Sequence, residues 1–199
     1  MVFFLLQNKK IQMFYPNTPG LRSLQGKEEL QQLLTQINIA RESTPTNSDT
    51  QKPPLLLKLA PDLSSDEMKE IAHVILRNES RVDGLIISNT TVDRSELNNI
   101  KYKDEAGGLS GKPLTKKSTE MIRMMYKLTK GNIPIVGVGG VFSGQDAYEK
   151  ILAGASTVQI YTALIYHGPP IVSKIKKELA ELLENDGYKS VNEAVGKGV

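Results

Sequence analysis

Four short apolar runs, each followed by a turn and a helical pattern, constrain the fold of this 199-residue chain most strongly. The runs are Leu55–Ala60, Asp83–Asn89, Ile133–Gly140 and Ser156–Ile160. Strands that alternate with helices are joined by crossovers and therefore lie parallel. The pattern predicts an α/β protein, either part of a doubly wound sheet or part of a (β/α)8 barrel.

The helices are predicted from apolar stripes and from start signals. Ser64 and Glu67 match a capping box, in which each side chain bonds the other residue's backbone N–H. Predicted helices cover Gly26 to Leu34, Ser64 to Ile75, about Leu114 to Thr129, Gly144 to Leu152, and Ile171 to Leu183. Predicted loops run from Arg41 to Pro53 and from Thr90 to Gly111, and Ile11–Tyr15 is a candidate for a fifth strand.

Composition excludes several classes of function. The net charge is only +3 and the basic residues are mixed with acidic ones, so no nucleic-acid surface is expected. The absence of cysteine excludes disulfides, thiolate zinc sites and cysteine nucleophiles. His73 and His167 are far apart in the sequence, so no metal site is expected. The apolar N-terminal run is too short for a membrane helix and lacks signal-peptide features, so this chain is expected to carry no membrane anchor.

Polar residues and glycines follow the carboxyl ends of the predicted strands. They are Lys58, Asn89-Thr90-Thr91, Gly139-Gly140 and Tyr161-Thr162. Both candidate architectures bind ligands at that edge of the sheet. Lys58 needs an anionic or polar partner if it is buried, or it extends to water at the strand edge. Asn89 and Thr90 either bind a ligand or hydrogen-bond the local backbone.

The glycine turn after the third strand fails one motif and suits another. A dinucleotide fingerprint that begins at Gly137 would need glycine where Phe142 stands. Barrels often bind phosphate with the loops after their last two strands. The backbone N–H groups of Gly140 and Thr162 are therefore predicted to share one phosphate, of a flavin mononucleotide or a phosphorylated sugar.

Longer motifs resemble dihydroorotate dehydrogenase, in its class 2, quinone-linked branch, from about Pro16 to Gly196. They are Lys58-Leu-Ala-Pro-Asp-Leu, Ser88-Asn-Thr-Thr-Val, Gly107-Gly-Leu-Ser-Gly-Lys-Pro-Leu, Gly137-Val-Gly-Gly-Val, Ser143-Gly-Gln-Asp-Ala, Ala153-Gly-Ala-Ser, Gln159-Ile-Tyr-Thr-Ala-Leu and Gly168-Pro-Pro. The resemblance implies a (β/α)8 barrel with FMN at its carboxyl edge. It also implies oxidation of dihydroorotate to orotate with ubiquinone as the electron acceptor.

The resemblance also implies site residues. The flavin would contact Lys58, Ser88, Gly111, Gly140, Tyr161 and Thr162. Dihydroorotate would contact Asn17, Asn89 and Thr90. Lys58 would face the flavin edge that becomes negative on reduction.

Two departures from the family pattern bear on activity. The family's base, Ser or Cys, precedes Pro-Asn-Thr, but Tyr15 stands there, and Gln12 stands where the family has asparagine. Residues 1–15 are therefore interpreted as an atypical segment, joined to residues 16–199 of a catalytic barrel. A complete barrel needs about 250 residues, so the chain is expected to hold only the last four to five βα units. Alone, it is expected to be poorly soluble and not to retain FMN.

Competing interpretations follow from the same residues. An inosine monophosphate dehydrogenase relative would need a cysteine nucleophile, which the chain lacks. A truncated, non-catalytic copy with weak or no flavin binding is the alternative. The resemblance places the parent protein, if eukaryotic, at the mitochondrial inner membrane, held there through an N-terminal segment not found in these residues.

Overall fold

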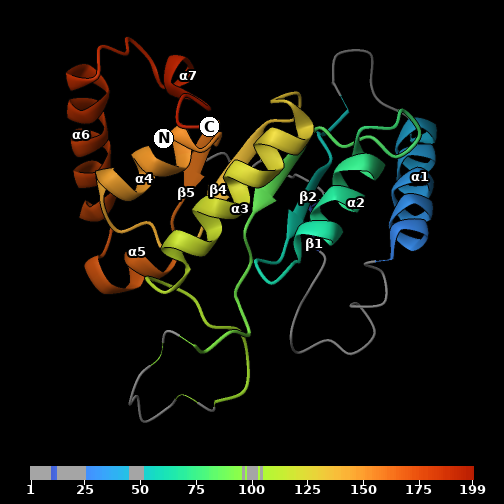
Figure 1. The fold of residues 1–199 in the computed structure, drawn as a ribbon, viewed down its shortest axis with the longest axis horizontal. Coiled ribbons are helices and arrows are strands. Elements are labelled where there is room, and N and C mark those ends of the chain that lie inside the picture. The colour runs from blue at the N-terminus through green and yellow to red at the C-terminus, as the bar shows by residue number, and fades with distance from the viewer. Residues whose placement is uncertain (1–9, 13–25, 45–51, 96, 98–102, 104) are drawn as a thin grey trace.

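The fold is described by a computed structural model that defines residues 10–12, 26–44, 52–95, 97, 103 and 105–199. Its centre is one sheet of five parallel strands in the order β1-β2-β3-β4-β5 (Figure 1). The strands are β1 (Lys10–Gln12), β2 (Leu56–Leu59), β3 (Gly84–Ile87), β4 (Ile135–Val138) and β5 (Thr157–Gln159). The prediction of parallel strands joined by helical crossovers is confirmed.

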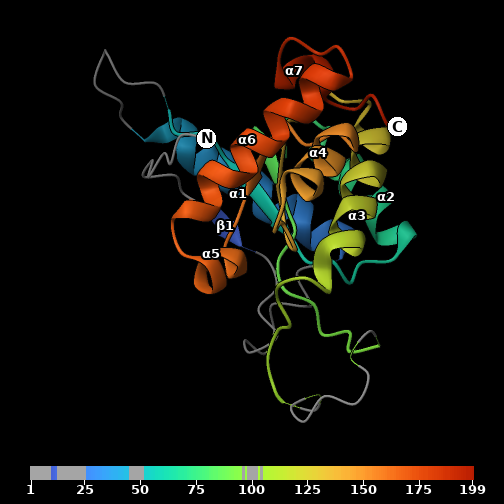
Figure 2. The same ribbon diagram turned by 90° about the vertical axis from the view of Figure 1, so that its left-hand side faces the viewer.

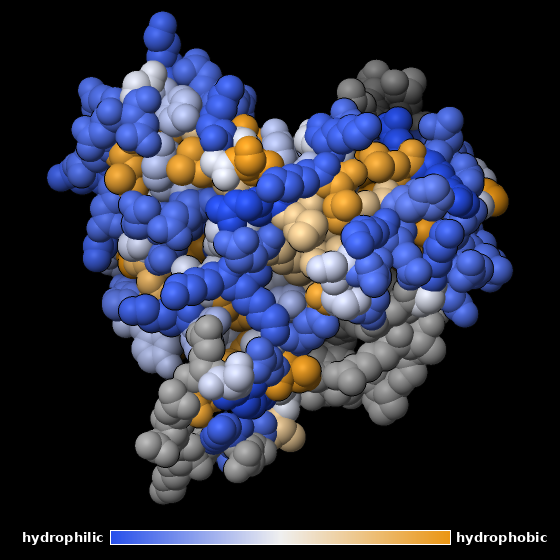
Figure 3. All heavy atoms as spheres, viewed as in Figure 1, coloured by the Kyte–Doolittle hydropathy of each residue, from blue (hydrophilic) through white to orange (hydrophobic). Residues whose placement is uncertain are grey.

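Helices follow the strands, and α2, α3 and α4 lie side by side over one face of the sheet (Figures 1 and 2). The helices are α1 (Lys27–Ser43), α2 (Ser65–Ile75), α3 (Leu114–Thr129), α4 (Gly144–Leu152), α5 (Thr162–His167), α6 (Pro170–Asn185) and α7 (Val191–Ala194). The exposed surface of this helical face is mostly hydrophilic (Figure 3). Among the residues that the structure describes, no helix is both long enough and apolar enough to span a bilayer.

The core lies between the helices and the sheet because side chains alternate along each strand. In β2, Leu57 and Leu59 are fully buried, whereas Leu56 and Lys58 are half-buried. Leu85 of β3 and Ile135 of β4 join the same apolar cluster as Leu57 and Leu59. Burial of each such side chain contributes about 2–3 kcal/mol, so this face fixes the register of the sheet.

The opposite face of the sheet carries Lys58 and the side chains beside it in the neighbouring strands. Lys58 lies beside Ile86 in the strand register, and Ile86 lies beside Val136. Rows of this kind, with members from neighbouring strands, fill the interior of (β/α)8 barrels. The chain therefore folds as part of an α/β barrel, and within the described residues the sheet is open at β1 and β5.

The helix start at Ser64 agrees with the predicted capping box. The Ser64 N–H donates to the Glu67 carboxylate at 2.7 Å, and the Glu67 N–H donates to Ser64 Oγ at 3.3 Å. The strand predicted at Ile11–Tyr15 is present as β1 over its first two residues, and residues 13–15 lie outside the described part.

Other boundaries differ from those predicted from the sequence. Helix α1 continues through Ser43, so the loop does not begin at Arg41. The short helices α5 and α7 were not predicted, because neither has enough turns to show an apolar period.

Candidate functional site

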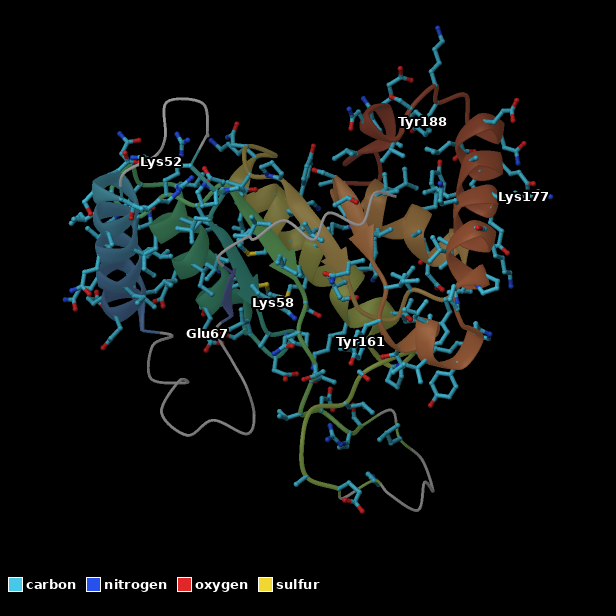
Figure 4. The ribbon with its side chains drawn as sticks, turned by 180° about the vertical axis from the view of Figure 1, so that it is seen from behind. Lys52, Lys58, Glu67, Tyr161, Lys177 and Tyr188 are labelled. Carbon is cyan, nitrogen blue, oxygen red and sulfur yellow. The ribbon has the colours of Figure 1, made fainter. Side chains whose placement is uncertain are left out.

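A cavity of about 350 Å³ lies at the carboxyl end of the sheet. Figure 4 shows Lys58, Glu67 and Tyr161 at this end, and Lys52 and Tyr188 near the other. The cavity lining includes Lys58, Ser88, Asn89, Thr90, Gly111, Gly140, Tyr161 and Thr162. The structure therefore brings together all the predicted site residues that it describes, whereas Tyr15 and Asn17 lie outside the described part. The role of each residue stays a prediction.

The turn after β3 is held by backbone hydrogen bonds to both neighbouring strands. The Ser88 N–H donates to Val138 O, and the Asn89 N–H donates to Leu59 O, each at 2.8 Å. Ser88 is almost fully buried, and its hydroxyl donates to Asn89 O at 3.0 Å. These bonds fix where the chain leaves the sheet, and thereby where Asn89 and Thr90 meet the cavity.

A polar cluster, Asp62, Thr91, Asp93 and Lys117, holds the backbone that follows Thr90. Lys117 Nζ, from α3, lies 2.7 Å from Asp62 Oδ1 and 3.2 Å from Asp93 Oδ2. Asp62 also accepts hydrogen bonds from the Thr91 hydroxyl and from the Val92 N–H. The cluster thus ties the turns after β2 and β3 to one helix.

The electrostatics of this cluster favour its ionised form. Burial opposes ionisation of Asp62, but hydrogen bonds from Lys117, Thr91 and Val92 outweigh burial and lower the pKa of its carboxyl. Hydrogen bonds from Ser95 and then Lys117 lower the pKa of Asp93 to about 2. Burial opposes the charge of Lys117, but Asp62 and Asp93 raise the pKa of its ammonium overall.

Replacing Lys117 tests the cluster through its pH dependence. Both carboxyl pKa values are lower in the folded state, so their stabilisation is present above pH 4 and is lost as the pH falls further. Lys117→Met should lower the free energy of unfolding by about 1 kcal/mol at neutral pH. The difference from wild type should shrink toward pH 2, as measured by urea unfolding.

A matched control uses an ion pair on the protein surface. Lys177 and Glu181 of α6 are exposed, with 4.0 Å between their charged atoms, so Lys177→Met should change stability little at any pH. If the free energies of unfolding of wild type and Lys117→Met differ by the same amount at every acid pH, the ionised carboxylates of Asp62 and Asp93 are not the source of the stabilisation.

The turn after β4 is built from two glycines with left-handed backbone, Gly139 at φ 113° and Gly140 at φ 70°. Two hydroxyls of α3 lie against their carbonyls, Ser118 Oγ at 3.0 Å from Gly139 O and Thr115 Oγ1 at 2.7 Å from Gly140 O. In a trans peptide unit the N–H points opposite to the C=O. The N–H groups of Gly140 and Val141 therefore point away from α3.

These two N–H groups are available for an anion. Gly140 and Val141 both line the cavity, and neither N–H donates to an acceptor within the described part of the chain. Buried N–H groups without acceptors are rare in folded proteins, so a ligand or water is expected there.

The loop before α3 meets α5 on the far side of the cavity. Thr162 Oγ1 donates to Ser110 Oγ at 3.0 Å. Gly111 has φ 88°, and a Cβ added there would lie 3.1 Å from Thr162 Cγ2. Glycine at this position thus permits both the backbone conformation and the close approach to α5.

The arrangement suits an elongated ligand with an anionic end. The turn after β4 offers two N–H groups, whereas β2 and the turn after β3 offer a cation, an amide and hydroxyls. In the described part of the chain, no group of three His, Asp or Glu side chains could hold a metal ion.

Three residues around the cavity were not identified from the sequence as site residues. Asp62 and Lys117 hold the turns after β2 and β3, and Lys150 of α4 is fully buried behind the glycine turn. Asp62 lies three residues after the end of β2, in the turn at the carboxyl edge of the sheet, so its place in the sequence was a usable signal. Lys150 is three residues from Ala147 and therefore lies on the apolar stripe of its helix. A lysine in that position was a second usable signal.

Comparisons with known proteins agree on one family. The sequence model described as dihydroorotate dehydrogenase matches residues 10–183. A mitochondrial dihydroorotate dehydrogenase (quinone) of Oryza sativa subsp. japonica is 54% identical over 182 residues, which are 91% of this chain and 38% of the relative. A dihydroorotate dehydrogenase (quinone) of Parvibaculum lavamentivorans is 51% identical, over 92% of this chain and 50% of the relative. The chain thus spans half or less of the length of these relatives.

A solved structure has the same fold. The ligand-free dihydroorotate dehydrogenase of Eimeria tenella superposes with a TM-score of 0.88 at 41% sequence identity. The match covers 94% of this chain and 54% of that protein.

Proposed function

The chain belongs to the dihydroorotate dehydrogenase family, and we propose that the protein oxidises dihydroorotate to orotate with FMN as cofactor and a quinone as electron acceptor. One observation carries the proposal. Lys58, Asn89, Gly140 and Thr162 come from different βα units and line one cavity. A flavin nucleotide needs groups for its ring, its phosphate and the substrate within one space, and this cavity offers all three.

The residues of the cavity fit FMN. The glycine turn after β4 presents two N–H groups without a protein acceptor in the described residues, as a phosphate requires. We assign the phosphate to the backbone of Gly111, Gly140, Tyr161 and Thr162, and the ring to Lys58 and Ser88.

The reaction removes a proton from C5 and a hydride from C6 of dihydroorotate, which leaves a C5–C6 double bond, and the quinone takes up two electrons and two protons. Bound FMN would supply the hydride acceptor. Asn89 and Thr90 would hold the carboxylate and ring amides of the substrate, so that C6 has one fixed position. Lys58 would place a positive charge where negative charge develops. The second substrate contact would come from Asn17.

We also propose a location from the relatives. If the source is eukaryotic, the protein belongs at the mitochondrial inner membrane, with an N-terminal segment as the membrane link. The Oryza sativa relative is named as a mitochondrial protein, which supports this location.

The alternative is a non-catalytic copy with weak or no flavin binding. It is favoured by one observation, the open sheet of the described residues, in which β1 and β5 each have one strand neighbour. An exposed strand edge promotes association with other chains.

Flavin retention and reduction separate the two functions. If the purified protein, incubated with FMN and then desalted, keeps a flavin absorbance spectrum, that result supports the enzyme and overturns the expectation from the sequence that the chain alone does not retain FMN. Anaerobic dihydroorotate should bleach the visible absorbance, and a quinone should restore it. Orotate is the control, because it has no hydride to give and should bleach nothing. A protein that stays colourless after incubation with FMN contradicts the proposal and supports the non-catalytic copy.

A further inference from the structure

Lys150 is the largest fully buried side chain described in this protein, and the proposed mechanism does not use it. Its ammonium, from α4, reaches three oxygens of α3. Nζ lies 2.6 Å from Ser118 Oγ, 2.9 Å from Thr119 Oγ1 and 3.1 Å from Thr115 O. All three acceptors are neutral, and no carboxylate forms an ion pair with Lys150 within the described residues. An ammonium buried among neutral oxygens is costly, which points to a role beyond packing.

The acceptors of Lys150 connect it to the cavity. Ser118 Oγ, which receives a hydrogen bond from Lys150, also lies 3.0 Å from Gly139 O. A hydroxyl has one hydrogen, and that of Ser118 is shared between Leu114 O at 2.8 Å, on its own helix, and Gly139 O at 3.0 Å, while its oxygen accepts from the ammonium. Thr115, whose carbonyl accepts from Lys150, places its own hydroxyl on Gly140 O.

This network sets the direction of two peptide units. With Gly139 O and Gly140 O held toward α3, the N–H groups of Gly140 and Val141 point into the cavity. The buried charge of Lys150 also favours an anion in the cavity. A cation in a medium of low dielectric, without a carboxylate bonded to it, favours an anion nearby more strongly than it would in water.

We propose that Lys150 is a positioning residue for the cofactor's phosphate: through Ser118 and Thr115 it holds the Gly139–Gly140 turn so that the N–H groups of Gly140 and Val141 face the phosphate. The inference rests on the proposed function, because it takes the anion to be the phosphate of FMN. A lysine that served only to fill space between α3 and α4 would affect every flavin equally.

Comparing FMN with riboflavin isolates the phosphate, because riboflavin has the same ring and ribityl chain without it. The measured quantity is the ratio of the two dissociation constants, from flavin fluorescence on titration with protein. Lys150→Met keeps the apolar stem, removes the ammonium and leaves the hydroxyls bonded to helix carbonyls, so the fold should persist. The preference for FMN over riboflavin should fall by about tenfold or more, while riboflavin affinity stays unchanged.

Two further variants separate positioning from packing. Ser118→Ala keeps Lys150 but removes its link to Gly139, and should also reduce the FMN preference. Thr119→Val removes another acceptor of the same ammonium, one that bonds only Lys150 and Thr115 O. Its FMN preference should match that of wild type.

A pH series gives a second readout. Burial lowers the pKa of Lys150 to about 8, against the opposing fields of Asp146 and Glu149 on its own helix. The groups that α3 presents to the ammonium are neutral, and β4 carries no titratable side chain. FMN's phosphate stays dianionic above pH 7, since its second pKa is about 6. The wild-type FMN preference should therefore fall as the pH rises from 7 to about 9, and Lys150→Met should show no such change.

The outcomes distinguish this inference from the proposed function. If wild type prefers FMN and both Lys150→Met and Ser118→Ala keep that preference, the role of Lys150 is wrong and the proposed function stands. If wild type binds riboflavin as tightly as FMN, the phosphate site itself is wrong, and the role of Lys150 is wrong with it.

Discussion

Gly140→Ala is expected to lower the free energy of unfolding by about 3–5 kcal/mol and to abolish FMN binding. Gly140 has φ 70°, where an L-residue costs about 1–2 kcal/mol. An added Cβ would also lie 2.4 Å from Thr115 N and 2.6 Å from Thr115 Cα, far inside van der Waals contact. The backbone of the turn must therefore move away from α3. That movement changes the direction of the Gly140 and Val141 N–H groups, so they no longer point into the cavity. Urea unfolding and FMN titration measure the two effects.

Gly187→Ala provides the matched control. Gly187 has φ 79°, close to that of Gly140, but an added Cβ would meet nothing within 4 Å. Gly187→Ala should therefore lower the free energy of unfolding only by the cost of the left-handed backbone, about 1–2 kcal/mol, and should leave FMN binding intact. Equal losses of stability in the two variants would show that Thr115 does not restrict the turn.

Lys58→Met is expected to reduce turnover of dihydroorotate by ~100- to 1,000-fold in the FMN-saturated enzyme. Lys58 is half-buried on the cavity face of β2, and its methionine replacement keeps the stem while it removes the charge. The loss should appear in the rate at which dihydroorotate bleaches the flavin. Substrate affinity should change less, because the proposed substrate contacts, Asn89 and Thr90, remain. Stopped-flow absorbance gives both quantities.

The control for Lys58 is a lysine at the same end of the sheet. Lys69 of α2 is exposed and pairs with Asp66, outside the cavity lining, so Lys69→Met should leave the rate unchanged. Lys58→Arg keeps the charge with a different shape and should give an intermediate rate. If Lys58→Met bleaches the flavin at the wild-type rate, the charge of Lys58 has no role in the reaction.

Much of the fold could be predicted because local patterns and tertiary packing agree. The buried strand Leu56–Leu59 and the capping box at Ser64 are visible in the sequence as an apolar run and a start signal. Six of the eight described site residues were predicted because they lie at or just past the carboxyl ends of strands, and parallel strands end at one edge. Ser88 and Gly111 came from the family resemblance.

The supporting residues could not be predicted in the same way. Lys150 bonds residues 31 to 35 positions earlier in the chain, and Lys117 bonds Asp62, 55 positions earlier. Such contacts depend on how neighbouring helices pack, which no local period encodes. On the sequence alone, Lys117 is one of two adjacent lysines on a helix, and a solvated surface is the ordinary environment for such residues.

Two consecutive residues of α3 hold opposite ends of the cavity. Lys117 reaches the turns after β2 and β3, while Ser118 reaches the turn after β4. The distance between the end of the cavity at Asn89 and the end at the Gly139–Gly140 turn is therefore fixed by a helix rather than by loop conformation. A ligand that contacts both ends must match that separation, so the site selects molecules by their length as well as by their charge.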